Sequence, residues 1–150
     1  MQMYDAKCEA DCPRKNVREV PTGCMVCGED NPHSMGATFN PSGADGAETE
    51  LVIPTLFQGF DRIAHGGTVA AVLDDAMWWA IFFSTGESTM TAQMTTRYHH
   101  PVRVAESLRV RGKMVSSRGR VFRTESHLLK VGEADGEYLA SAEGTYLIPR

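Results

Sequence analysis

The chain has 150 residues, of which 42% are hydrophobic and 23% are charged, and its formal net charge is −4. This length and composition are typical of one globular domain with a substantial hydrophobic core. The acidic balance and the lack of a basic block argue against nucleic acids and anionic membranes as partners.

The sequence predicts an arm without regular structure over residues 1–30 and one domain over residues 31–150. The arm is rich in Cys, Pro, Asp and Arg and shows no sustained hydrophobic periodicity. It contains no apolar segment of the kind that a secretory signal requires. We therefore expect a cytoplasmic protein.

Two strands are predicted before the centre of the chain, over residues 34–43 and 48–56, with a glycine-containing turn between them. A loop with three glycines follows over residues 57–67. The next segment, Thr68–Phe83, is hydrophobic on all sides and predicts a helix that is buried almost completely. Gly86 is well placed to end this helix.

A transmembrane interpretation of this segment is excluded by Asp74 and Asp75, which lie in its middle. On membrane-insertion scales, each aspartate at the centre of a helix costs about 2.5–3.5 kcal/mol. The segment is therefore expected to be the core helix of a globular domain.

After the helix the periodicity changes to two, which is typical of half-buried strands. Four strands are predicted, joined by short turns, over residues 91–102, 106–115, 120–131 and 137–148. We expect these four strands to form an antiparallel meander. The predicted fold is α+β, with an antiparallel sheet of five to six strands wrapped around one long buried helix. One helix face would need a second subunit as its cover, so we expect at least a dimer.

The two aspartates raise a question of their own, because a buried carboxylate must be paired, neutralised or given a function. Neighbouring residues on a helix point about 100° apart, so Asp74 and Asp75 cannot share one face. Either both lie in a polar groove between subunits, or one of them enters a cleft and takes part in chemistry.

The HGG sequence at residues 65–67 favours the second interpretation. The backbone amides of Gly66 and Gly67 open the helix at its positive end, where they are suited to bind a carbonyl oxygen, a carboxylate or a phosphate. Asp74 lies about 12 Å further along the helix. The amide of one subunit could therefore meet the carboxylate of another across a two-fold axis.

The segment HGGTVAAVLDDAM (65–77) resembles the signature of hotdog-fold acyl-CoA thioesterases of the PaaI-like, or thioesterase-superfamily-member, branch. The resemblance runs over residues 24–148 and includes CMVCGEDNP (24–32), FQGFDRIAHGG (57–67) and TTRYHHPV (95–102). It implies a hotdog fold and the hydrolysis of an acyl-CoA thioester to a free acid and coenzyme A. It also implies a homodimer or a dimer of dimers that needs no cofactor for catalysis.

The resemblance further implies a role for each matching residue. Asp74, nine positions after His65, corresponds to the general base or nucleophile, and the Gly66 amide corresponds to the group that polarises the thioester carbonyl. Thr91 matches a position where relatives carry a serine that orients the water. Gln58 resembles an Asn or Gln that contacts the thioester or the water, and His65 is expected to hold the loop.

Further residues are candidates for binding the substrate. The Gly67 amide adjoins the expected carbonyl site. Trp78 stands one turn after Asp74, where relatives have a small or hydroxyl residue, so it is expected to shape the acyl pocket. The phosphates of coenzyme A need cationic partners, for which the candidates are Arg97, Arg103, Arg118 and Arg120. The alternative for each arginine is that it lies on a solvent-exposed strand face and binds no ligand.

The cysteines, all within the first 27 residues, form two pairs, Cys8-x3-Cys12 and Cys24-x2-Cys27. Such a cluster in a cytosolic protein is more typical of metal binding or free thiols than of disulfides. A structural zinc held by all four thiolates is one interpretation. Unligated thiols are the interpretation that we prefer, because relatives carry the CMVCGEDNP stretch without the earlier pair.

Two other functions compete with acyl-CoA hydrolysis. One is a non-catalytic hotdog module that binds acyl-CoA or acyl carrier protein, and the other is a thioesterase for acyl chains on a carrier protein. The buried Asp74 together with Gly66 favours an enzyme, since binding alone does not need a costly buried acid.

Overall fold

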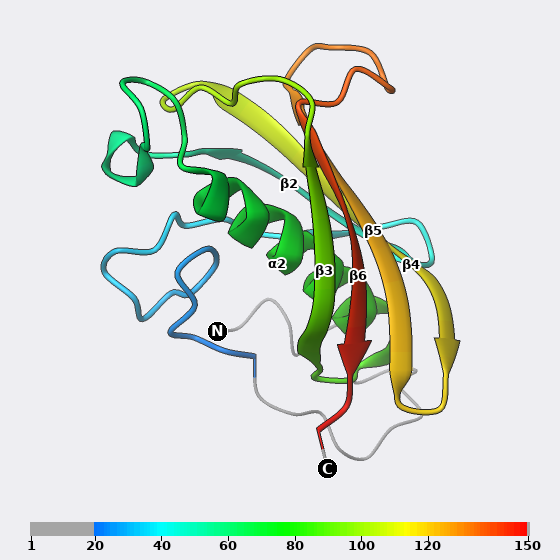
Figure 1. Ribbon diagram of the computed structural model, residues 1–150. Helices are drawn as coiled ribbons and strands as arrows, with labels where there is room; N and C mark the ends of the chain where they lie inside the picture. Colours follow the sequence, from blue (N-terminus) through cyan, green and yellow to red (C-terminus); the bar gives the residue numbers. More distant parts are fainter. Residues whose placement is uncertain (1–19, 150) are drawn as a thin grey trace.

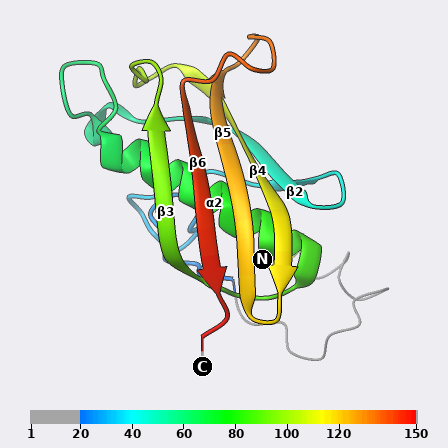
Figure 2. The same cartoon turned by 45° about the vertical axis from the view of Figure 1, so that its right-hand side comes forward.

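The computed structural model describes residues 20–149, and Figure 1 shows the arrangement of its helix and strands. The elements, in chain order, are β1 (Asn40–Ser42), β2 (Gly46–Val52), the 3-10 turn η1 (Thr55–Phe57), α2 (Gly66–Thr85), β3 (Met90–Tyr98), β4 (Ser107–Arg118), β5 (Val121–Lys130) and β6 (Ala140–Leu147). The strands form one antiparallel six-stranded sheet. Figure 2 shows this sheet lying across α2, so the predicted α+β architecture is confirmed.

The expected four-strand meander is wrong, because the sheet order is β1-β2-β4-β5-β6-β3. Of the described strands, β4, β5 and β6 form a meander, whereas β3 lies at the far edge beside β6. The segment between β3 and β4 is too long for a tight hairpin and crosses the start of α2. There the Val102 carbonyl accepts a hydrogen bond from the Ala64 amide, and the Ala105 amide donates to the Ile53 carbonyl. These bonds carry the chain to the middle of the sheet.

The first predicted strand is also shorter than expected, since only Asn40–Ser42 pair with β2. The residues before it pack along α2 instead of extending the sheet. The Ala37 amide donates to the Val26 carbonyl, and the buried Phe39 ring stacks on Trp79 with 6.1 Å between the ring centroids. Burial of these apolar side chains against the helix therefore competes successfully with strand pairing.

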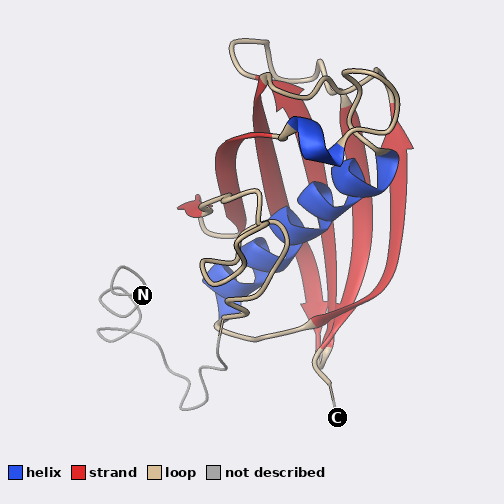
Figure 3. Cartoon of the chain, turned by 90° about the vertical axis from the view of Figure 1, so that its left-hand side faces the viewer, coloured by secondary structure: helices blue, strands red, loops and turns tan. Residues whose placement is uncertain are grey.

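The helix α2 lies between the sheet and the looped segment 20–39 (Figure 3). The sheet side is so close that β4 has a glycine, Gly112, where it crosses the backbone of Ala76 and Met77. Residues 20–39 thus cover part of the helix face for which a second subunit was expected. None of the described helices has the length and apolarity that a membrane-spanning helix requires.

Both ends of α2 are capped by local hydrogen bonds. At the start, the His65 imidazole accepts a hydrogen bond at Nδ1 from the Gly67 amide, with 2.9 Å between the nitrogens. At the end, Gly86 takes a left-handed conformation with φ of 69°, and its amide donates to the Phe82 carbonyl. The glycine stop that the sequence predicts is confirmed.

We predict that Gly112→Ala lowers the free energy of unfolding by at least about 3 kcal/mol, because overpacking against an unyielding backbone lies at the upper end of such costs. A Cβ atom at this position would lie 2.0 Å from the Ala76 carbonyl oxygen and 2.8 Å from the Met77 amide nitrogen. The measurement is urea unfolding followed by tryptophan fluorescence. The control is Gly23→Ala, whose Cβ would meet nothing within 4 Å. Equal stability of the two variants would contradict the close packing of α2 on β4.

Candidate active site

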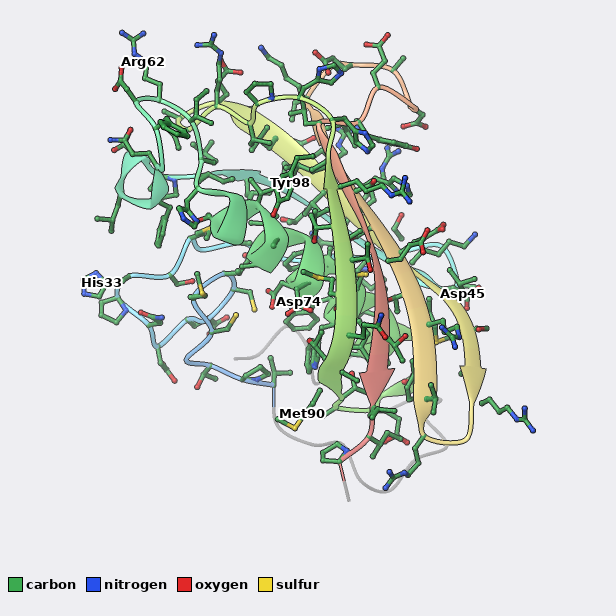
Figure 4. The ribbon with its side chains drawn as sticks, in the orientation of Figure 1. His33, Asp45, Arg62, Asp74, Met90 and Tyr98 are labelled. Carbon is green, nitrogen blue, oxygen red and sulfur yellow. The ribbon has the colours of Figure 1, made fainter. Side chains whose placement is uncertain are left out.

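The first of the two helix carboxylates, Asp74, is half-buried and faces β3 and β6. Figure 4 shows it midway along α2, beside β3. Its Oδ1 atom accepts two hydrogen bonds, from Thr91 Oγ1 at 2.8 Å and from the Tyr146 hydroxyl at 2.6 Å. The structure therefore brings Asp74 and Thr91 together, as the resemblance implies, and adds a tyrosine that our sequence analysis did not identify.

Tyr146 is fully buried, and its hydroxyl also lies 3.0 Å from the Asp74 carbonyl oxygen. Burial, together with the neighbouring Asp74 carboxylate, raises the pKa of Tyr146 well above its usual range, so the phenol keeps its proton and acts as a donor. A signal for this residue exists in the sequence. It alternates with Ala140, Ala142 and Gly144 on the buried face of its strand, and a buried tyrosine hydroxyl needs a partner.

A β-bulge in β3 sets the direction of its side chains. Thr91 pairs with Tyr146 and Gln93 pairs with the preceding residue of β6, so the register shifts by one at Ala92. In a regular strand, Thr91 and Tyr98 would point to opposite faces. Here both contact α2, since Thr91 donates to Asp74 and the Tyr98 hydroxyl donates to the Gly66 carbonyl at 2.7 Å. The bulge thus allows one strand to hold the helix at two points.

The start of α2 offers one free backbone donor. The Gly67 amide, expected to bind substrate, is already bonded to His65. The exposed Gly66 amide has no acceptor among the described residues, and the helix dipole favours negative charge at this position. Gly66 and Asp74 are eight residues apart on one helix, or about 12 Å at about 1.5 Å per residue. Within one chain they cannot contact the same carbonyl group.

Gln58 lies in the loop before α2 and is exposed. Its Oε1 accepts a hydrogen bond from the Arg62 amide at 3.2 Å, and its backbone forms a bridge with Ala64. Arg62 has a φ of 59°, in the left-handed region that a non-glycine residue seldom adopts. The Gln58 side chain therefore helps to hold this turn closed.

The candidate arginines lie in separate places, all exposed. Arg97 is on β3, next to Tyr98, and Arg103 pairs with the loop before α2. Arg118 and Arg120 flank the β4–β5 turn, which the strand register places near the start of β3, away from Gly66. A single chain does not bring that turn to the start of α2.

Trp78 follows Asp74 by one helical turn and is half-buried. Its indole N–H donates to the Thr89 carbonyl at 3.0 Å, and its ring stacks on Phe82 with 5.1 Å between the centroids. The loop between α2 and β3 and a neighbouring ring of the same helix thus fix the orientation of the tryptophan. It lies on the same side of α2 as Asp74.

The second carboxylate, Asp75, points to segment 20–39, where Cys24 Sγ lies 3.4 Å from Asp75 Oδ1. Burial is the main cause that raises the pKa of Asp75 to about 7. Cys24 and Cys27 are both reduced in the structure. Cys8 and Cys12, the other two residues of the predicted four-cysteine site, lie outside the described residues.

Comparison with known proteins identifies relatives of this fold. The model of the thioesterase superfamily matches residues 62–136. The thioesterase superfamily protein RHA08564 is 29% identical, with a TM-score of 0.73 over 82% of this chain, which spans 62% of the length of that protein. The PaaI protein from the phenylacetic acid degradation operon of E. coli is 13% identical over 75% of this chain and 83% of its own, with a TM-score of 0.66.

A third solved structure, of smu.793 from Streptococcus mutans UA159, contains bound acetyl-CoA. It is 15% identical, with a TM-score of 0.66 over 75% of this chain and 88% of its own. None of the curated proteins matches the chain at a significant level. The structural matches confirm the predicted hotdog fold of the PaaI-like type.

We predict that His65→Ala lowers the free energy of unfolding by about 1 kcal/mol, because a helix loses its amino-terminal cap. His65→Asn keeps a side-chain acceptor and should retain most of the stability. Urea unfolding of both variants measures the difference. The control is His33→Ala, at an exposed histidine outside the helix. Equal stability of His65→Ala and the unmodified protein would show that the bond to Gly67 does not stabilise α2.

Proposed function

Since the chain belongs to the thioesterase superfamily, we propose that it hydrolyses an acyl-CoA thioester to a free acid and coenzyme A. The observation that carries this proposal is the Asp74 carboxylate, held on a core helix by the hydroxyls of Thr91 and Tyr146. Keeping a carboxylate in such surroundings costs solvation free energy. A residue with a purely structural role could be apolar and would avoid this cost. The acetyl-CoA bound to smu.793 supports coenzyme A as the carrier.

We assign Asp74 the role of general base. Both hydroxyls donate to its Oδ1 atom, and no described residue donates to Oδ2. This oxygen therefore remains able to take a proton from water. The water oxygen then attacks the thioester carbonyl carbon, the carbon–sulfur bond breaks, and the departing thiolate of coenzyme A takes up the proton.

The Gly66 amide is our candidate for stabilising the tetrahedral intermediate. It is exposed, lacks an acceptor among the described residues and lies at the positive end of α2. A preorganised amide of this kind lowers the reaction barrier by on the order of 3 kcal/mol. The Tyr98 hydroxyl, which donates to the Gly66 carbonyl, fixes the peptide on the other side of the same residue.

We propose that a second copy of the chain completes the site. With two α2 helices antiparallel across a two-fold axis, the Gly66 amide of one copy lies beside the carboxylate of the other. A half-buried stripe at a spacing of four residues, Ala70, Asp74 and Trp78, supports this arrangement. The edge strand β3 also supports it, since β6 is its one described partner, and such edges are normally covered.

The same dimer would bring arginines of the two copies together. Antiparallel packing sets the β4–β5 turn of one copy, with Arg118 and Arg120, at the end of the dimer where the other copy presents Gly66 and Arg97. We propose these three guanidinium groups for the phosphates of coenzyme A. Backbone amides of the turn around Gly119, which has a φ of 59°, are further donors for a phosphate.

We predict that Asp74→Asn lowers kcat/KM for acyl-CoA hydrolysis by at least about 10²-fold, the lower bound for loss of a general base. Release of the coenzyme A thiol from a panel of acyl-CoA esters measures it, and circular dichroism checks the fold. Asp45→Asn, at an exposed loop aspartate, is the matched control. Full activity in Asp74→Asn would remove this carboxylate from the chemistry, and binding without hydrolysis by the unmodified protein would favour the non-catalytic module.

We predict that Tyr146→Phe and Thr91→Val each lower kcat by about tenfold and leave KM nearly unchanged. Each variant removes a hydrogen bond that positions the base. A hydrogen bond to a charged group contributes about 1.5–3 kcal/mol. An increase of about 1.4 kcal/mol in the reaction barrier lowers the rate tenfold. Tyr138→Phe is the control, because that ring packs on His127. A rise in KM at constant kcat would instead assign the two hydroxyls to substrate binding.

A further inference from the structure

A second cluster of reactive side chains lies on the other side of α2 from the Asp74 site. Cys24 and Cys27 come from segment 20–39, and Asp75 comes from the helix, so residues about 50 positions apart in the sequence meet here. The two sulfur atoms and one carboxylate oxygen all lie within 4.8 Å of one another. Each of the three residues is half-buried.

The geometry of the cluster fits a tetrahedral cation. With zinc–sulfur and zinc–oxygen distances of about 2.3 Å and 2.0 Å, two tetrahedral ligands lie about 3.5 Å apart. The observed distance between Cys24 Sγ and Asp75 Oδ1 is 3.4 Å. A small movement of the Cys27 side chain is enough to complete three corners of the tetrahedron.

The backbone around the cysteines is arranged to support sulfur ligands. The Val26 amide donates to Cys24 Sγ at 3.3 Å, and the Trp79 indole N–H donates to Cys27 Sγ at 3.4 Å. The turn is tight, because the Gly28 amide donates to the Cys24 carbonyl and a Cβ at Gly28 would lie 2.4 Å from the Cys24 nitrogen. Outer hydrogen bonds of this kind orient ligands around metals.

The cluster also lacks a compensating charge. Asp75 Oδ2 is buried without a hydrogen-bond partner among the described residues. The sulfur atoms of Cys24 and Cys27 lie beside this carboxyl group. Burying such groups without a partner is costly, and no described cation pairs with them.

We propose that Cys24, Cys27 and Asp75 together bind a divalent cation of the zinc class, with water in the fourth position. The cation would join segment 20–39 to α2 and neutralise most of the charge of the two thiolates and the carboxylate. This site differs from the four-cysteine arrangement considered from the sequence, because a carboxylate on the core helix supplies the third ligand. It is independent of the proposed hydrolysis, since Asp75 points away from the Asp74 site.

Titration of the full chain with Co²⁺ tests the proposal. The protein is purified under a phosphine reductant, stripped with a chelator and titrated while thiolate-to-cobalt charge-transfer and tetrahedral d–d absorption are recorded. We expect one equivalent of Co²⁺ to bind and Zn²⁺ to displace it. Asp75→Asn should weaken binding by at least about tenfold, as loss of an inner ligand exceeds the effect of outer-shell changes. Cys24→Ser and Cys27→Ser should each weaken Co²⁺ binding and reduce the charge-transfer band, and the variant that carries both substitutions should lose the band.

Two controls separate this site from its alternatives. Asp74→Asn removes the adjacent carboxylate and should leave Co²⁺ binding unchanged, and the double variant Cys8→Ser/Cys12→Ser should also bind normally. Absence of the absorption bands in the unmodified protein would overturn the proposal. Unchanged affinity in Asp75→Asn, or loss of the bands in the double variant, would overturn it as well and favour a four-thiolate site in the latter case.

A measurement on the unmodified chain guards against variants that fail to fold. Alkylation of the stripped protein, followed by peptide mapping, reports the reactivity of each cysteine with and without Zn²⁺. We expect Zn²⁺ to protect Cys24 and Cys27 and to leave Cys8 and Cys12 reactive. Equal reactivity of Cys24 and Cys27 in the presence and absence of Zn²⁺ would contradict a metal at this position.

Discussion

The rest of the structure depends on two adjacent carboxylates on a helix that is covered from both sides. Because Asp74 and Asp75 point about 100° apart, no single neighbouring element can satisfy both. The sheet supplies hydroxyl donors to the first, from Thr91 and Tyr146. Segment 20–39 supplies a cysteine to the second. Polar contacts therefore fix the rotation of α2 about its axis, which its nearly uniform hydrophobic surface would leave poorly determined.

The crossing from β3 to β4 is what leaves the Asp74 carboxylate accessible. Had the four later strands formed a meander, β3 would pair with β4 instead of β6. Instead the segment after Tyr98 crosses the start of α2 and enters the sheet beside β2, so β3 remains an edge. Thr91 is consequently exposed although it is bonded to a half-buried carboxylate. An edge position thus combines a preorganised acid with an open approach for a ligand.

The predictable features of the fold are those that local patterns encode. The continuous hydrophobic run and its flanking glycines define α2, and alternation defines the later strands, because both signals depend on neighbours in the sequence. The strand order depends on bonds such as that from Ala105 to Ile53, which no local pattern specifies. The bulge at Ala92 is equally hidden. Tyr146 was missed for a related reason, since its partner Asp74 lies 72 positions away.

Use of the His65 side chain as a helix cap has a consequence for the proposed chemistry. It occupies the Gly67 amide and leaves Gly66 as the free donor at the start of α2. A rigid helix keeps that donor about 12 Å from the Asp74 carboxylate of its own chain, and no rotamer change can close such a gap. If the base and the donor act on one thioester, they must come from different copies. Activity would then fall with dilution of the dimer, whereas the hydrogen bonds that hold Asp74 within each chain would persist.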